Sequence, residues 1–129
     1  MDEFIDSLKR DKTRGELAPH QIILLLTFLE VYKSNQSINF QIIQLIETFD
    51  KKWNEHQVKF KTKNKCIGMP IKAFYNKGLI EIDFTATITD FRRNNELSSK
   101  ISNIRIGEEI LKVLITEKIK EYLIERIIC

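Results

Sequence analysis

The chain has 129 residues, of which 43% are hydrophobic and 30% charged, with a formal net charge of +3. This length and composition are those of a single ordinary soluble globular domain, long enough for a real core. Two cysteines are too few for a disulfide framework and have no metal-ligand spacing, and no apolar run reaches the roughly 18–20 residues of a membrane span. The start Met1-Asp2-Glu3-Phe4 is acidic, unlike a secretory signal, so a reducing cytoplasm is the expected compartment.

The first part of the chain predicts two helices and a linker. Residues 2–12 have the spacing of a short amphipathic helix, and residues 13–17 read as a linker. A strong helix follows from Ala18 to about Asn35. Because it is apolar almost all round, we expect it to lie buried at the centre of the domain.

A third helix is predicted between Asn39, a good N-cap residue, and about Asn54, since its apolar residues recur at helical spacing. Residues 57–67 are polar and basic, and apolar residues alternate with lysines. That alternation fits an edge strand protected by lysines, and equally an extended loop lying along a phosphate backbone.

The stretch from Gly68 to Phe84 predicts a short helix followed at once by a strand. Pro70 suits the first helical position, and Gly78 suits the residue just past the helix end, where positive φ is needed. The apolar face of this helix consists of Ile71, Phe74 and Tyr75. One face of the strand carries Ile80, Ile82 and Phe84. We expect this helix to meet DNA, with Pro70 and Ala73 on the side that meets it.

The remaining elements complete the predicted fold. Residues 85–100 are a long polar segment, and residues 104–106 alternate as a returning strand, so the two strands and the segment between them form a wing. Two helices close the chain, at 108–115 and 116–127, with Thr116 as the N-cap of the second. We predict a mainly helical, α+β, winged-helix-like DNA-binding domain with a small β-hairpin wing and two C-terminal helices. It spans 1–129, with an N-terminal helix and linker (1–17), a winged-helix-like core (18–106) and C-terminal helices (107–129).

Positive charge gathers beside the predicted DNA-facing helix. Between His56 and Ile80 there are six lysines and no acidic residue. Such a cluster is the electrostatic signature of a site for a polyanion, although a solvated loop has the same composition. The residues expected to contact the DNA backbone or bases are Lys61, Lys63, Lys65, Lys72, Asn76 and Lys77.

Catalysis finds little support in the sequence. The chain has two histidines and four scattered glycines, with no phosphate-binding loop and no nucleophile motif. An Asp-x-Lys pattern at residues 50–52 falls at the polar end of a helix, away from the strand and second acid that a metal nuclease would require. We therefore expect no enzyme activity, no cofactor and no metal.

His20 and Gln21 stand in the first turn of the predicted central helix. A helix N-terminus leaves free N–H groups and a partial positive charge, which favour an anion such as a phosphate. For His20 the alternative is a surface or capping histidine, which the sequence alone favours over an anion site. For Pro70 the alternative is an ordinary helix start, and for Ala73 a small residue that permits close packing.

Three short motifs occur in the order found in a known family. Residues 18–26 (Ala-Pro-His-Gln-Ile-Ile-Leu-Leu-Leu), residues 69–82 (beginning Met-Pro-Ile-Lys-Ala-Phe-Tyr) and residues 104–111 resemble the sulfur-binding domain of phosphorothioate-dependent, type IV restriction endonucleases. The resemblance covers most of the chain from about Ala18 to Ile128. It implies a small hydrophobic cup that accepts the non-bridging sulfur of a phosphorothioate linkage. The positions carried over are His20, Gln21, Met69, Pro70 and Ala73.

The chemistry that the resemblance implies is plausible for these residues. Sulfur is larger and more weakly hydrated than oxygen, so apolar surfaces reward its burial, while a helix N-terminus accommodates the charge. The chain departs from the family pattern at Gln21, where Arg or Lys is usual, and at Met69, where an aromatic residue is usual. The nuclease domain that usually accompanies the module is absent from these residues.

The expected function is therefore a module of a bacterial restriction-modification or other defence system. It would recognise phosphorothioate-modified duplex DNA without catalysis of its own, alone or with a separate nuclease subunit, and without a membrane. One alternative is a winged-helix transcriptional regulator that reads bases through Lys72, Asn76 and Lys77. Another is a protein-interaction domain that does not bind DNA. The sequence leaves open the oligomeric state and the DNA sequence around the modified site.

Overall fold

The computed structural model describes residues 12–13, 16–17, 19–60, 63 and 65–127. This part of the chain is mainly helical, with a small antiparallel sheet, so the predicted α+β class is confirmed. The helices are α2 (His20–Asn35), α3 (Ile42–His56), α4 (Gly68–Asn76), α5 (Asn94–Lys100), α6 (Glu108–Leu114) and α7 (Ile119–Ile127), with a 3₁₀ turn at Gln57–Lys59. The strands are β1 (Lys12–Thr13), β2 (Glu16–Leu17), β3 (Asn39–Phe40), β4 (Ile80–Phe84) and β5 (Ile101–Ile106).

The main sheet has three strands in the order β3-β5-β4, and both pairings are antiparallel. Strand β5 is central: Ile104 faces Phe40 of β3 on one side and Ile82 of β4 on the other. The register between β4 and β5 shifts between Asp83 and Phe84. Strands β1 and β2 form a separate antiparallel pair.

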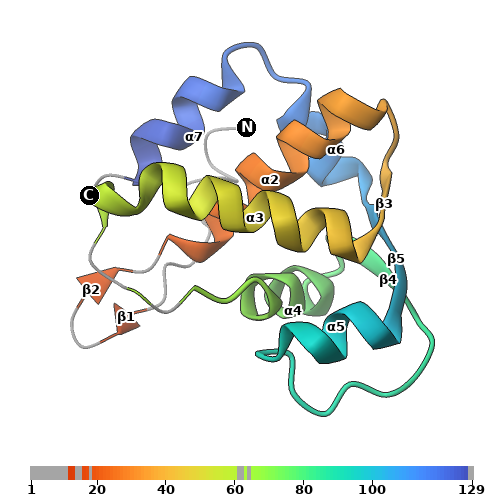
Figure 1. Ribbon diagram of the computed structural model, residues 1–129. Helices are drawn as coiled ribbons and strands as arrows, with labels where there is room; N and C mark the ends of the chain where they lie inside the picture. The colour runs from red at the N-terminus through yellow and green to blue at the C-terminus, as the bar shows by residue number, and fades with distance from the viewer. Residues whose placement is uncertain (1–11, 14–15, 18, 61–62, 64, 128–129) are drawn as a thin grey trace.

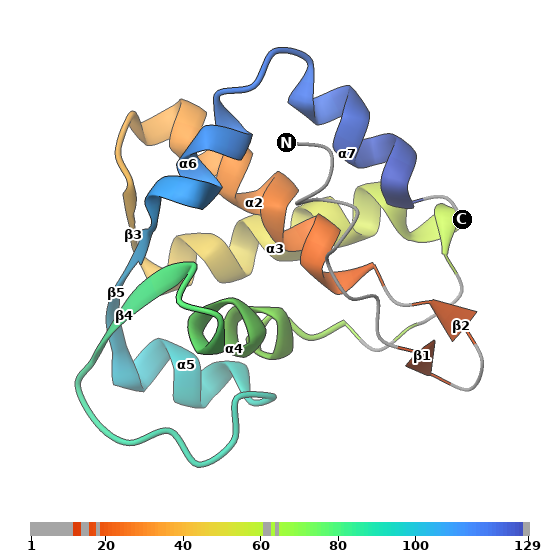
Figure 2. The ribbon, with the colours of Figure 1, turned by 180° about the vertical axis from the view of Figure 1, so that it is seen from behind.

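Helix α2 runs through the middle of the domain, with α6 and α7 on one side and α4 on the other (Figures 1 and 2). Eleven of its residues are buried, from His20 to Leu29 and Val31, because its sequence is apolar almost all round. The Phe28 ring lies 5.5 Å from Phe40 of β3 and 6.3 Å from Phe74 of α4, measured between ring centroids. This aromatic cluster joins the central helix to the sheet and to α4, and the prediction of a buried central helix ending near Asn35 is confirmed.

An ion pair between the buried Lys52 and the half-buried Glu30 joins α2 to α3. The Lys52 ammonium lies 2.7 Å from Glu30 Oε1 and 3.5 Å from Glu55, and only 6% of the Lys52 side chain is exposed. The pKa of Glu30 is lowered, chiefly by the hydrogen bond from Lys52. A buried lysine requires such a partner, since an unpaired charge is costly to remove from water.

Several predicted boundaries were wrong in the first half of the chain. Asn39 is part of β3 rather than an N-cap, and α3 begins at Ile42. Residues 12–13 and 16–17 pair as strands within the predicted helix end and linker, and the rest of the predicted first helix lies outside the described residues. Residues 57–59 form a 3₁₀ turn, so the described part of the lysine-rich segment provides no edge strand.

Boundaries also differ in the second half. Helix α4 begins two residues before Pro70, which is therefore its third residue rather than its first. The polar segment predicted as a wing contains a helix, α5, that was not expected from the sequence. Thr116 does not cap the last helix, which begins at Ile119 after a turn with Lys118 at φ 60°.

Candidate nucleic-acid interface

Helix α4 has one buried and one exposed face. Ile71 and Phe74 are fully buried, whereas Tyr75, predicted to share their face, is 40% exposed. The helix ends at Asn76, and Gly78 lies just past the end as predicted, with a φ of 74°. At this end the Leu79 N–H donates to the Phe74 carbonyl, and the Gly78 N–H donates to the Tyr75 carbonyl. These two bonds form a Schellman motif, in which Gly78 has the left-handed conformation. The cap leads the chain directly into β4, and α4 packs against this strand of the sheet.

The exposed face of α4 carries the polar residues that were predicted from the sequence to contact DNA. Lys72, Asn76 and Lys77 are all exposed. None of these three forms an ion pair with another described residue. The two lysines therefore keep their charge available for an anion.

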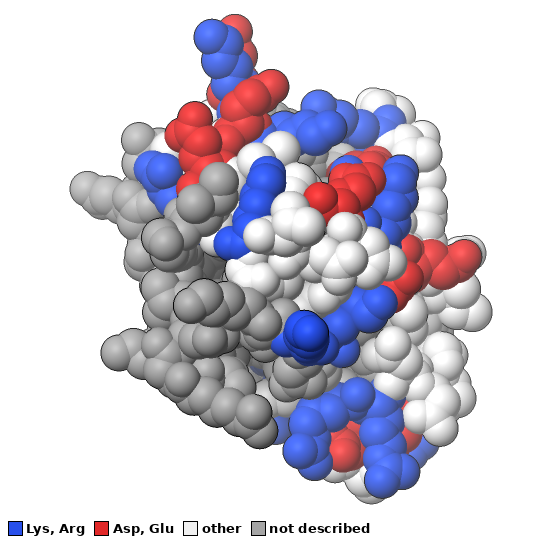
Figure 3. Space-filling model, turned by 60° about the vertical axis from the view of Figure 1, so that its left-hand side comes forward, with Lys and Arg blue, Asp and Glu red and all other residues white. Residues whose placement is uncertain are grey.

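The other predicted lysines lie on the segment before α4. Lys63 is exposed, and Lys65 pairs with Asp50 of α3, which offsets its charge. Lys61 lies outside the described residues. Figure 3 shows one face of the molecule, on which Lys and Arg side chains form several separate patches with acidic side chains beside several of them. The charge on this face is thus mixed rather than continuously positive.

The predicted sulfur cup draws on two helices that pack against each other, α2 and α4. His20 and Gln21 lie in the first turn of α2. Met69 and Pro70 lie in the first turn of α4, and Ala73 lies one turn later. Met69 is 42% exposed and Ala73 is half-buried, while Pro70 is buried. His20 and Gln21 are each only 7% exposed. Ligand access through Met69 and Ala73 of α4 is therefore easier than access through the first turn of α2.

The side chains at the start of α2 are held inside the domain. The His20 ring lies 5.0 Å from the Trp53 ring of α3, between centroids. Gln21 Oε1 is buried and has no hydrogen-bond partner among the described residues. A 180° rotation of this amide exchanges its oxygen and nitrogen, so either atom could occupy this point. The two orientations are told apart only by their hydrogen bonds. This first turn therefore holds one amide with unused hydrogen-bonding capacity.

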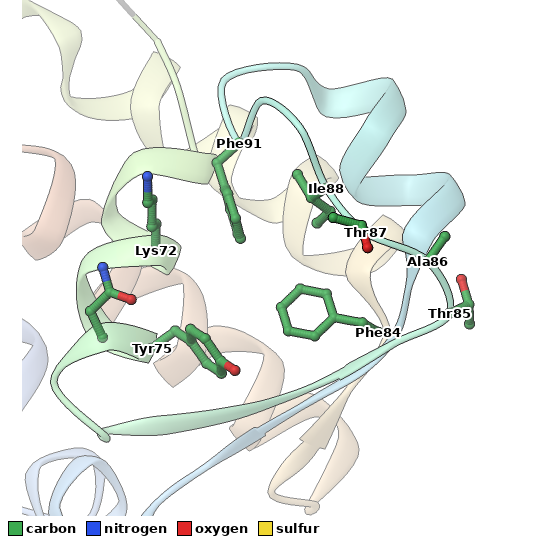
Figure 4. Close-up of a pocket in the computed structure, with 9 residues that line it drawn as sticks. Lys72, Tyr75, Phe84, Thr85, Ala86, Thr87, Ile88 and Phe91 are labelled. Atoms are coloured by element: carbon green, nitrogen blue, oxygen red, sulfur yellow. The ribbon is translucent and has the colours of Figure 1, made fainter.

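A second feature beside α4 was missed from the sequence. A pocket of about 440 Å³ lies between α4 and the segment that follows β4. Figure 4 shows the Tyr75, Phe84, Ile88 and Phe91 side chains around an open space, with Thr85 and Ala86 farther out. The lining residues are Lys72, Tyr75, Asn76, Phe84, Thr85, Ala86, Thr87, Ile88 and Phe91. Strand alternation placed Phe84 with the buried Ile80 and Ile82, so its position in a pocket could not be expected from the sequence. Phe84 is 40% exposed and stands where the register between β4 and β5 shifts.

Glu96 of α5 anchors the segment that lines the pocket. Its carboxylate accepts hydrogen bonds from Lys100 (2.8 Å), from the Thr89 N–H and hydroxyl (3.1 and 2.9 Å) and from the Asp90 N–H (3.0 Å). These hydrogen bonds lower the pKa of Glu96 to about 2, and the bond from Lys100 has the largest effect. An ionised Glu96 thus fixes the backbone at residues 89–90.

The start of α4 also contacts this segment closely. A Cβ placed on Gly68 would lie 1.5 Å from the Phe91 carbonyl oxygen, so the backbone of residue 91 occupies the space that any larger side chain would need. In the segment between β4 and α5, the Arg92 guanidinium donates two hydrogen bonds to the Asp90 carboxylate, of 3.0 and 3.1 Å. These bonds lower the pKa of the Asp90 carboxyl. Helix α4 and the pocket segment therefore form one packed unit.

The described residues contain no group of three or more His, Cys, Asp or Glu side chains placed to hold a metal ion. Within the same residues, every helix is too short or too polar to cross a membrane. No protein-family model matches this chain, and no curated protein matches it.

Proposed function

We propose that this chain is a winged-helix-like domain that binds duplex DNA through α4. The observation that carries the proposal is the arrangement of α4: it leads through the Gly78 cap into β4 of a sheet ordered β3-β5-β4, and it turns three exposed polar side chains outward. The element order helix, strand, helix, helix, strand, strand is that of a winged helix with α5 inserted between the last two strands. In that fold the helix before the strand pair enters the major groove.

We further propose that the preferred target carries a phosphorothioate linkage. Support comes from the family resemblance together with the exposure of Met69 and the half-burial of Ala73. A thioether and a methyl group are soft and apolar, which suits sulfur better than a hydrated oxygen. Burial of one atom of this size supports discrimination of about 1–3 kcal/mol.

Two duplexes of identical sequence, one with a single Rp phosphorothioate, test both parts of the proposal in one titration by fluorescence anisotropy. Tighter binding of the thio-substituted duplex supports the full proposal. Equal binding of both, dependent on the base sequence, favours a regulator that reads bases through Lys72, Asn76 and Lys77. Absence of binding to either duplex at low salt overturns DNA binding and leaves a protein-interaction domain.

The variant Ala73→Glu locates the contact. Because Pro70 is buried, a glutamate there would threaten the fold, and the half-buried Ala73 is the better position. We expect Ala73→Glu to abolish the preference for sulfur, and Ile115→Glu, which adds the same charge at a residue that is 65% exposed on another part of the surface, to leave it unchanged. If Ala73→Glu keeps the preference, the sulfur is bound elsewhere.

The dependence of the DNA-binding constant on salt concentration tests whether the lysines contact phosphates. On duplex DNA, each phosphate contact contributes about −0.9 to the slope of log K against log salt concentration. Lys63→Ala and Lys77→Ala should each weaken binding to every duplex alike and reduce the slope by roughly one contact. A lysine whose removal leaves the slope unchanged does not contact a phosphate.

A further inference from the structure

The pocket beside α4 is walled by three aromatic rings. The Tyr75 and Phe84 centroids lie 5.6 Å apart and those of Phe84 and Phe91 lie 6.5 Å apart, and both pairs meet edge to face. Tyr75 and Phe84 are each 40% exposed, and Figure 4 shows the three rings grouped around the open space of the pocket. Large aromatic surface is thus held open to solvent at one place on the domain.

Among the residues that line this pocket, Lys72 is the one charged residue, and its charge is positive. Lys72 and Asn76 line it from α4, and Thr85 and Thr87 line the opposite wall, where the Thr85 hydroxyl donates to the Ser99 carbonyl at 3.3 Å. The lining residues include no carboxylate, and the Lys72 ammonium lies 5.8 Å from the Phe91 ring centroid. The pocket therefore offers an aromatic wall and a single positive charge a few ångströms from it.

We infer that this pocket binds one unpaired nucleotide, with its base against the aromatic rings and its phosphate at Lys72. This inference rests on the proposed function, since α4 would bring DNA past the pocket. A base has a flat apolar face for the rings, hydrogen-bonding edges for Asn76 and Thr87, and an attached anion for Lys72. The volume of about 440 Å³ lies within the range of roughly 300–1,000 Å³ typical of small-molecule sites.

The same observations argue against other ligands. A fully paired base has both faces covered by its stacked neighbours, so it reaches such a pocket only when it leaves the helix. A purely apolar ligand would bury the Lys72 and Asn76 groups without partners, which is unfavourable. The base must therefore come from an extrahelical position in DNA or from a free nucleotide, and these two sources are separated by experiment.

The experiment compares three probes on the whole chain. The first is a fluorescein-labelled, fully paired duplex; the second is the same duplex with one unpaired adenine; the third is free deoxyadenosine monophosphate. We expect roughly ten-fold tighter binding of the second duplex than of the first, as base–aromatic stacking supports. Phe84→Leu should remove that gain and leave affinity for the paired duplex unchanged, and Phe84→Tyr, which keeps the ring, should retain the gain.

Each outcome decides between the inference and the proposed function. If both duplexes bind equally, or Phe84→Leu keeps the gain, the pocket site is wrong while DNA binding stands. If neither duplex binds but the free nucleotide does, in a way that depends on Phe84, the pocket takes a nucleotide and the proposed DNA function is wrong. If no probe binds, both are wrong. Ile115→Leu serves as the matched control at a residue that is 65% exposed outside the pocket, and it should behave as the parent does in every arm.

Discussion

Replacing Gly68 by alanine tests how the start of α4 is built. An added Cβ would lie 1.5 Å from the Phe91 carbonyl oxygen and 2.6 Å from its carbon, whereas real Cβ atoms stay at least 3.0 Å from other heavy atoms. The helix start and residue 91 would therefore have to separate by at least 1.5 Å. The neighbouring Leu97 side chain, 3.4 Å away and fully buried, limits the direction in which they can move.

Two opposing effects set the size of the change. Alanine is favoured over glycine inside a helix by about 0.5–1 kcal/mol. Forcing extra volume into a packed site costs about 1–3 kcal/mol, and here the obstacle is backbone rather than a flexible side chain. The steric cost should win, so we expect Gly68→Ala to lower stability by about 1–2 kcal/mol, or roughly 4–10 °C in Tm for a chain of this length.

Thermal unfolding and amide hydrogen exchange of residues 85–93 measure this prediction. Gly78→Ala is the matched control: its φ of 74° makes alanine strained there, but no other atom lies within 4 Å of the added carbon. We expect that control to lower Tm by a similar amount, since left-handed backbone costs about 1–2 kcal/mol, without faster exchange at residues 85–93. A Gly68→Ala variant as stable as the parent, or more stable, would mean that helix propensity dominates and that the contact with residue 91 is not tight.

Three further predictions concern the packing of the domain. Glu30→Ala should lower stability by about 2–3 kcal/mol in urea unfolding, because it removes the closer partner of the buried Lys52 ammonium; the effect stays below that of a fully buried pair because 35% of the Glu30 side chain is exposed. The pKa of Glu96 is about 2 in the fold against a model-peptide value of 4.5, so its contribution to stability is present above pH 4.5 and is lost as the pH falls toward 2; Glu96→Gln should flatten the acid side of the Tm–pH profile. Phe28→Ala should cost about 3–5 kcal/mol, since the ring is fully buried between β3 and α4.

Each of these has its own control. Lys51, whose side chain is 60% exposed, also pairs with Glu30, and Lys51→Ala should change stability by under about 1 kcal/mol; a loss equal to that of Glu30→Ala would show that burial of the pair is unimportant. Ile43→Ala, at a residue that is 57% exposed on α3, should cost far less than Phe28→Ala. An acid profile identical in the parent and in Glu96→Gln would exclude the Glu96 carboxylate as the group that titrates.

The sequence by itself determined the elements whose signals are local. Continuous apolar residues made α2 recognisable, and the glycine after α4 marked its end, since positive φ at a helix end is a local requirement. The polar exposed residues Lys72, Asn76 and Lys77 were also readable from helical spacing. The preference for a sulfur-substituted backbone came from resemblance and stays a prediction.

Only the tertiary structure decided what depends on residues far apart in the sequence. The Tyr75, Phe84 and Phe91 rings meet because α4 packs against the end of β4 and because Glu96 and Gly68 position the segment around residue 91. No local pattern encodes these contacts, since each needs two elements to pack against each other. The same holds for the ion pair of Lys52: helical spacing places this lysine on the face of Leu45 and Phe49, but only the packing of α2 against α3 supplies Glu30 as the partner of its charge.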